Sequence, residues 1–141
     1  MKFVCDAGNG KTWFRMETEV EADQESALMQ HAVAKHFRLA KDKATASYKP
    51  TSTVYIEQNI GLEAHLQRQM PLFLTLRDRD GTGLATAMLP PAGNEIPGFR
   101  TIVVGPDNSD PYKDQSEAIQ VLGQNFGLAL ERADCFPYRQ T

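Results

Sequence analysis

The start of the chain has the pattern of a β-hairpin. Lys2–Asp6 and Thr12–Thr18 are short segments rich in apolar, aromatic and β-branched residues, and the dipeptide Asn9-Gly10 lies between them. Asparagine and glycine tolerate the positive φ angles of a tight turn, so this dipeptide between two such segments is a strong hairpin signal. The segment therefore predicts two antiparallel strands joined by a tight turn.

A second hairpin and a further strand are predicted later in the chain. Leucines alternate with other residues over Leu72–Leu76, and the apolar segment Leu84–Leu89 follows the charged, glycine-containing segment Arg77–Gly83. This arrangement predicts a strand, a turn and an antiparallel partner. Phe99–Val104 contains Ile102, Val103 and Val104 in succession, a pattern typical of a strand covered on both faces.

Residues 53–70 give a mixed pattern. The segment Thr-Val-Tyr-Ile-Glu at 53–57 has the composition of a strand. From Ile60 to Leu66 apolar residues alternate with others, which is the period of a strand. Leu62–Met70, however, consists almost wholly of good helix formers. The alternation favours an extended strand over 60–70, with a helix as the alternative.

Two segments have the period of an amphipathic helix. Thr18–Glu21 has the spacing of a capping box, and from Asp23 to about Lys43 apolar residues recur on one face, which predicts one long helix. Asp114–Glu117 has the spacing of an acidic capping box that would open a second helix, and Gly127 suits its C-terminal end.

These elements predict a single α+β domain over residues 1–141. The expected order is β-β-α-β-β-β-β-β-α, with six to eight strands in a mainly antiparallel sheet and two helices packed on one face. The apolar tail Cys135–Tyr138 is expected to dock on this domain.

Composition and charge narrow the class of protein. The chain has 141 residues, with 15 basic and 18 acidic residues and a net charge of −3, so nucleic-acid binding is not expected as its main activity. No apolar run approaches the roughly 20 residues of a transmembrane helix. The first residues lack the apolar stretch of a secretory signal. We therefore expect a cytoplasmic protein, with Cys5 and Cys135 as free thiols.

The segment Cys5–Thr12 partly matches the phosphate-binding P-loop. That motif requires a glycine, four further residues and Gly-Lys-Ser/Thr, between a strand and a helix. Gly10-Lys11-Thr12 fits, but position 5 is cysteine and the following residues predict a strand. A hairpin turn is therefore the favoured interpretation. A phosphate or nucleotide site that uses the Gly8–Thr12 turn, through Lys11 and Thr12, is the alternative.

The loop from Asp107 to Asp110 is rich in oxygen-bearing side chains. Turn and capping chemistry accounts for such residues, and their spacing is not that of an EF-hand. Because the loop joins a predicted buried strand to a helix N-terminus, Asp107, Asn108 and Asp110 are the second candidate group for a ligand site. No catalytic residue, metal site or cofactor is predicted.

The predicted long helix carries two histidines and a polarised charge. His31 and His36 are five residues apart, which separates them by about 140° around a helix axis, whereas helical metal pairs are four apart. We interpret them as unrelated, with only His36 at the border of the apolar face. Acidic residues at the start of the helix and basic residues at its end complement the helix dipole. The basic residues are Lys35, Arg38, Lys41 and Lys43.

The sequence contains none of the common hydrolase, zinc-protease or dinucleotide-binding motifs. Our leading hypothesis is a non-catalytic binding or accessory protein, for which a homodimer is one expected form. A small enzyme or phosphate-ligand binder, using either loop described above, is the alternative. Weak nucleic-acid binding through the basic end of the long helix is a third hypothesis.

Overall fold

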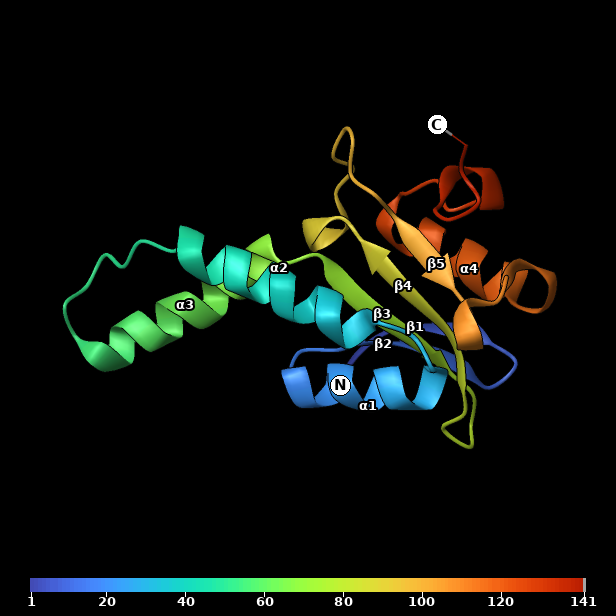
Figure 1. Ribbon diagram of the computed structural model, residues 1–141, viewed down its shortest axis with the longest axis horizontal. Coiled ribbons are helices and arrows are strands. Elements are labelled where there is room, and N and C mark those ends of the chain that lie inside the picture. Colours follow the sequence, from blue (N-terminus) through green and yellow to red (C-terminus); the bar gives the residue numbers. More distant parts are fainter. Residues whose placement is uncertain (141) are drawn as a thin grey trace.

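A five-stranded antiparallel sheet, with its strands in chain order, forms the centre of the computed structural model, which describes residues 1–140 (Figure 1). β1 (Lys2–Gly8) and β2 (Lys11–Arg15) form the first hairpin. β3 (Leu72–Arg77) and β4 (Gly83–Leu89) form the second, and β5 (Ile102–Val104) pairs with β4. Both predicted hairpins are confirmed.

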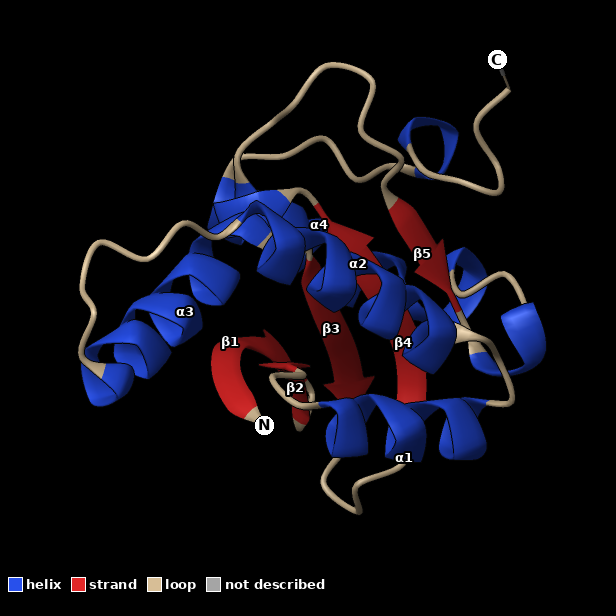
Figure 2. Cartoon of the chain, turned by 60° about the vertical axis from the view of Figure 1, so that its left-hand side comes forward, coloured by secondary structure: helices blue, strands red, loops and turns tan. Residues whose placement is uncertain are grey.

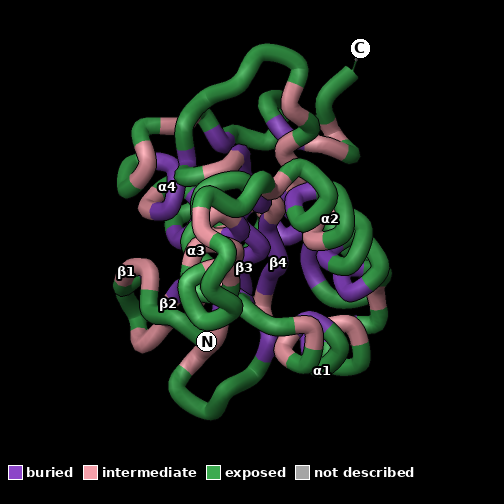
Figure 3. The backbone as a smooth tube through the Cα atoms, turned by 90° about the vertical axis from the view of Figure 1, so that its left-hand side faces the viewer, coloured by how far each residue is buried: buried purple, intermediate pink, exposed green. Residues whose placement is uncertain are grey.

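Helices cover both faces of this sheet. α1 (Glu19–Met29), α2 (Val33–Ser47) and α3 (Tyr55–Gln69) lie between β2 and β3 in the chain, whereas α4 (Tyr112–Phe126) follows β5. Figure 3 shows α4 on one side of β3 and β4, with α1 and α2 on the other. The α+β class is confirmed. The expected six to eight strands, their order, and the placement of two helices on one face are wrong.

The reason for two covered faces is visible in β3, whose residues from Leu72 to Leu76 are all buried. Leu72, Leu74 and Leu76 belong to one core, which α4 closes with Ala118, Ile119 and Leu122. Phe73 belongs to a second core on the opposite face, where its ring meets that of Phe37 edge-on at 5.2 Å. The alternation of leucines was only half of the pattern, because the residues between them are buried as well.

The predicted long helix is broken into α1 and α2. Gln30 adopts a left-handed conformation (φ 54°, ψ 52°) and ends α1. The side chains of Ser26 and His31 then accept the backbone N–H groups of Ala34 and Val33 at the start of α2. This local capping allows the chain to turn, so that α1 and α2 pack as neighbours across the sheet (Figure 2). At the other end of α1, the predicted capping box of Thr18 and Glu21 is confirmed.

Residues 55–69 form α3, so the strands predicted at 53–57 and over 60–70 are wrong. The helix formers of Leu62–Met70 outweigh the local alternation, because Leu62, Leu66 and Met70 recur every four residues and pack on the second core. The helix packs closely on the end of α2 at Gly61, where an added Cβ would lie 2.1 Å from the Tyr48 hydroxyl. In Figure 1, α3 and the end of α2 project away from the sheet.

The C-terminal part of the chain departs from the prediction at the start of two elements. The strand predicted over Phe99–Val104 is β5, which covers only Ile102–Val104, and Ile102 lies at an open cavity, so the strand is not covered on both faces. α4 begins at Tyr112, before the predicted capping box of Asp114. Its N-cap residue Pro111 makes no side-chain hydrogen bond, and the carboxylate of Asp110 accepts the Tyr112 N–H at 2.9 Å instead. Gly127 ends the helix with φ 71°. The tail docks beside β5, where Phe136 exchanges backbone hydrogen bonds with Thr101 and Val103. Cys135, like Cys5, is a free thiol.

Candidate functional site

An open cavity of about 640 Å³, which we call the groove, lies over β4 and β5 on the face that α1 and α2 cover only in part. The strand register places Phe73, Met88 and Ile102 in one row across β3, β4 and β5. Thr86 and Val104 form the neighbouring row. The floor of the groove is therefore mainly apolar, with Met88 and Ile102 half-exposed.

The rim of the groove comes from segments that are far apart in the sequence. His31 and His36 come from the α1–α2 junction and the first turns of α2, Arg100 from the segment before β5, and Phe136 from the docked tail. The two histidines line the same cavity. The expected 140° separation assumed one continuous helix, and the break at Gln30 removes that assumption.

A buried polar network lies beneath one end of the groove. The Glu25 side chain is 0% exposed, and its carboxylate accepts hydrogen bonds from Arg77 Nη2 and Thr86 Oγ1, both at 2.6 Å. His31 Nε2 lies 2.8 Å from Thr86 Oγ1. Arg77 Nε donates to Thr75 Oγ1 at 3.0 Å. These contacts attach α1 to the centre of the sheet.

The network favours one tautomer of the neutral His31 ring. Because the Thr86 hydroxyl donates its proton to Glu25, its oxygen accepts the Nε2–H of His31, while His31 Nδ1 accepts the Val33 N–H at 3.4 Å. Burial lowers the pKa of His31, and the nearby Glu25 carboxylate only partly opposes this shift. Both ring nitrogens of a neutral imidazole are thus engaged within the protein.

Arg100 carries the permanent positive charge of the groove. Its guanidinium carbon lies 4.4 Å from the centroid of the Phe136 ring, a cation–π distance. Arg100 is exposed, and it forms no ion pair with any other residue of the described range 1–140. Its planar N–H groups are therefore available to a ligand at the rim.

The first candidate group from the sequence lies outside the groove. Lys11 and Thr12 begin β2, so a strand follows the Gly8–Thr12 turn where a P-loop would have a helix. Lys11 Nζ donates to Gln115 Oε1 at 2.8 Å, across to α4. Thr12 pairs with Asp6 and Arg77 in the sheet.

The second candidate group lies partly at the groove. Asn108 borders it, whereas Asp107 does not line it. Asp110 accepts the Tyr112 N–H and the Arg132 Nε at 2.7 Å, and these two contacts, the backbone one first, lower its pKa. No hydrogen bond or ion pair between described residues joins Lys11 or Thr12 to this loop.

The predicted basic cluster is partly neutralised. Arg38 forms ion pairs with Asp23 and, at 3.8 Å, with Glu19, and Lys41 also lies 3.8 Å from Glu19. These contacts became possible because the break at Gln30 folds the acidic helix beside the basic one. A phosphate backbone would have to compete with these carboxylates.

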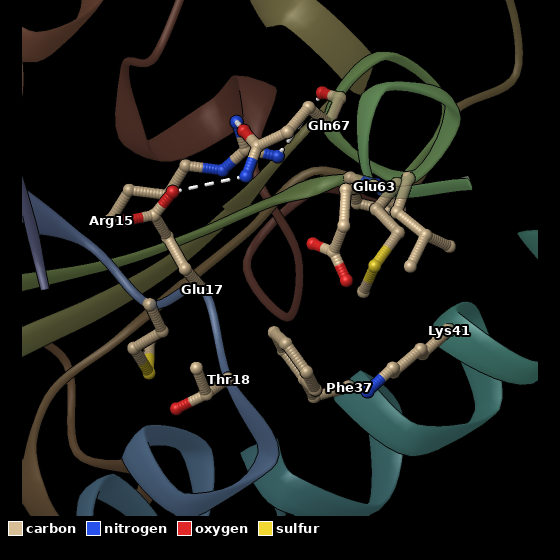
Figure 4. A pocket seen from close by; sticks show the side chains of 11 residues that line it. Arg15, Glu17, Thr18, Phe37, Lys41, Glu63 and Gln67 are labelled. Atoms are coloured by element: carbon tan, nitrogen blue, oxygen red, sulfur yellow. Dashed lines mark hydrogen bonds between the residues drawn. The ribbon is translucent and has the colours of Figure 1, made fainter. Parts of the chain in front are cut away.

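A smaller cleft of about 130 Å³ lies between β2, α2 and α3 (Figure 4). Gln67 accepts from Arg15 Nη1 at 2.8 Å and donates to Glu17 at 3.0 Å. Burial lowers the pKa of Arg15, and Glu17 opposes that shift. Glu63 from α3 and Lys41 from α2 complete the walls (Figure 4). The main polar side chains of this small cleft bond to one another, and these bonds connect β2 to α3.

Comparisons with protein-family models, with curated proteins and with solved structures found no match. No group of three or more His, Cys, Asp or Glu residues within 1–140 is arranged to hold a metal ion. Over the same residues, no helix combines the length and apolar character needed to span a bilayer.

Proposed function

We propose that this is a non-catalytic binding protein that holds a small, largely apolar organic molecule in the groove. The observation that carries the proposal is the uncovered part of the sheet, where Met88, Ile102 and Val104 form an apolar floor in a cavity of about 640 Å³. Binding sites for small molecules typically have volumes of roughly 300–1,000 Å³ and apolar linings with few polar groups.

The chemistry of the lining supports binding rather than catalysis. General acid–base or nucleophilic catalysis needs a reactive group paired with a base or acid within hydrogen-bond reach. Both ring nitrogens of His31 are occupied, and the Thr86 hydroxyl is held by Glu25. The lining residues include no aspartate, glutamate or cysteine. The groove therefore offers shape and apolar contact without such a catalytic pair.

The proposal can be tested by titrating the protein with Nile red, an uncharged apolar dye whose fluorescence rises in apolar surroundings. Ile102→Trp places a larger side chain in the groove, so we expect it to weaken dye binding about tenfold or more, equivalent to roughly 1.4 kcal/mol. Ile60→Trp makes the same change on exposed α3, outside the groove, and should leave the affinity unchanged. Absence of dye binding, or equal binding by both variants, would refute the proposal.

A further inference from the structure

We propose that the groove selects apolar ligands that carry a carboxylate group, an inference that rests on the proposed function. The lining contains the cation Arg100 and the imidazole of His36 but no acidic residue. The chain as a whole carries 18 acidic residues and a net charge of −3. The lining of the groove is therefore more positive than the chain as a whole, which favours an anionic ligand.

Arg100 is suited to a carboxylate in particular. Its guanidinium carbon lies 4.4 Å from the centroid of the Phe136 ring, a cation–π contact that holds the group at the rim of the groove. A guanidinium presents parallel N–H groups that match the two oxygens of a carboxylate. Since Arg100 has no ion-pair partner within residues 1–140, a ligand would not have to displace one.

The apolar floor defines the other half of the ligand. Met88 and Ile102 are half-exposed on the sheet, and Phe73 and Val104 extend the apolar surface beside them. A ligand with a carboxylate at one end and a hydrocarbon body would satisfy the rim and the floor together. The first turn of α2 contributes Val33 and His36 to the lining, so the positive end of a helix dipole also borders the groove.

The test compares two ligands with the same hydrocarbon chain, decanoate and decanol, at neutral pH. Affinities are measured by isothermal titration calorimetry and by displacement of Nile red. We expect decanoate to bind at least about tenfold more tightly than decanol, because hydrogen bonds to charged groups are stronger than those to neutral ones. Arg100→Gln should remove this difference by weakening the binding of decanoate far more than that of decanol. Arg79→Gln, an exposed arginine outside the groove, is the matched control.

The outcomes separate this inference from the proposed function. Equal binding of decanoate and decanol, or a preference for decanoate that Arg100→Gln does not reduce, would overturn the carboxylate assignment and leave the groove as an apolar site. Failure of both ligands and of Nile red to bind would overturn both proposals. Loss of the preference in Arg100→Gln, with its retention in Arg79→Gln, would support the inference.

Discussion

Glu25 is a charged residue with no exposure to solvent, and its partners determine whether that burial is tolerated. Arg77 supplies the compensating charge at 2.6 Å, and Thr86 supplies a hydrogen bond at the same distance. Removing one partner of a buried ion pair leaves an uncompensated charge, whereas replacing both by apolar residues is often close to neutral. The pair should therefore behave non-additively.

We expect Arg77→Met to lower the free energy of unfolding by about 3–5 kcal/mol. The double variant Glu25→Met/Arg77→Met should lose clearly less than the single variant, because no buried carboxylate remains. Urea unfolding followed by circular dichroism measures both. Arg79→Gln, on an exposed residue two positions later, should change stability by no more than about 0.5 kcal/mol. An Arg77→Met variant as stable as this control would contradict the prediction.

The buried imidazole of His31 should make stability depend on pH. Burial lowers its pKa in the folded protein, while the unfolded chain has the ordinary value of about 6.5. As the pH falls, the unfolded state therefore takes up the proton first, so stability is fully present above about pH 6.5 and declines below it. One proton contributes a slope of at most about 1.4 kcal/mol per pH unit.

The measurement is urea unfolding of the wild type and of His31→Gln at several pH values from neutral to mildly acidic. The His31→Gln variant should lack the part of the decline that starts near pH 6.5. His36→Gln, which removes an exposed histidine of the same groove, should retain that decline. An identical pH dependence in the wild type and His31→Gln would show that His31 does not titrate as described.

At the scale of elements, three local signals in the sequence were sufficient. The hairpin at Asn9-Gly10, the capping box at Thr18 and the end of α4 at Gly127 each follow from a few adjacent residues, and all three are present. The strand predicted over residues 60–70 was wrong because the alternation of apolar residues and the helix propensity of the segment pointed to different structures. The helix found there packs on α2 and on the second core, and no local pattern in the sequence shows these contacts.

The candidate site could not be predicted from local sequence patterns either, because its residues are far apart in the chain. Its rim joins His31, Arg100 and Phe136, which only the folded topology brings together. One signal was available in the sequence: Asn108 was singled out because its loop joins a strand to a helix, and it does border the groove. The break at Gln30 places both histidines at the cavity, but the sequence there contains no glycine or proline that would predict a helix end.

That break leads to a test at the level of an element. Gln30 has φ 54°, a left-handed conformation that costs a residue with a Cβ roughly 1–2 kcal/mol and that glycine adopts readily. Gln30→Gly should therefore raise the free energy of unfolding, by up to about 1 kcal/mol. Gln24→Gly, the same change inside α1, should lower it by about 1 kcal/mol. Thermal unfolding distinguishes the two, and a loss of stability in both would contradict the assigned break.

For the whole molecule, α3 is anchored less firmly than α4. α4 closes one core with three buried apolar side chains, whereas Leu66 is the only buried residue within α3. Tyr55, Ile56 and Ile60 at the start of α3 are 74%, 68% and 65% exposed. Local opening is easiest where few apolar contacts are lost. The projecting start of α3 should therefore open independently of the sheet.

Amide hydrogen exchange, read by NMR or mass spectrometry, tests this expectation. In dilute protein, amides of residues 55–61 should exchange with an opening free energy well below that of global unfolding, and amides of β3 only through global unfolding. Equal protection of both at every concentration would contradict it. Protection of 55–61 that increases with protein concentration would instead show that a second copy covers Ile56 and Ile60, which is the homodimer expected from the sequence. The same titration therefore measures how firmly α3 is held and whether it is the surface through which the chain self-associates.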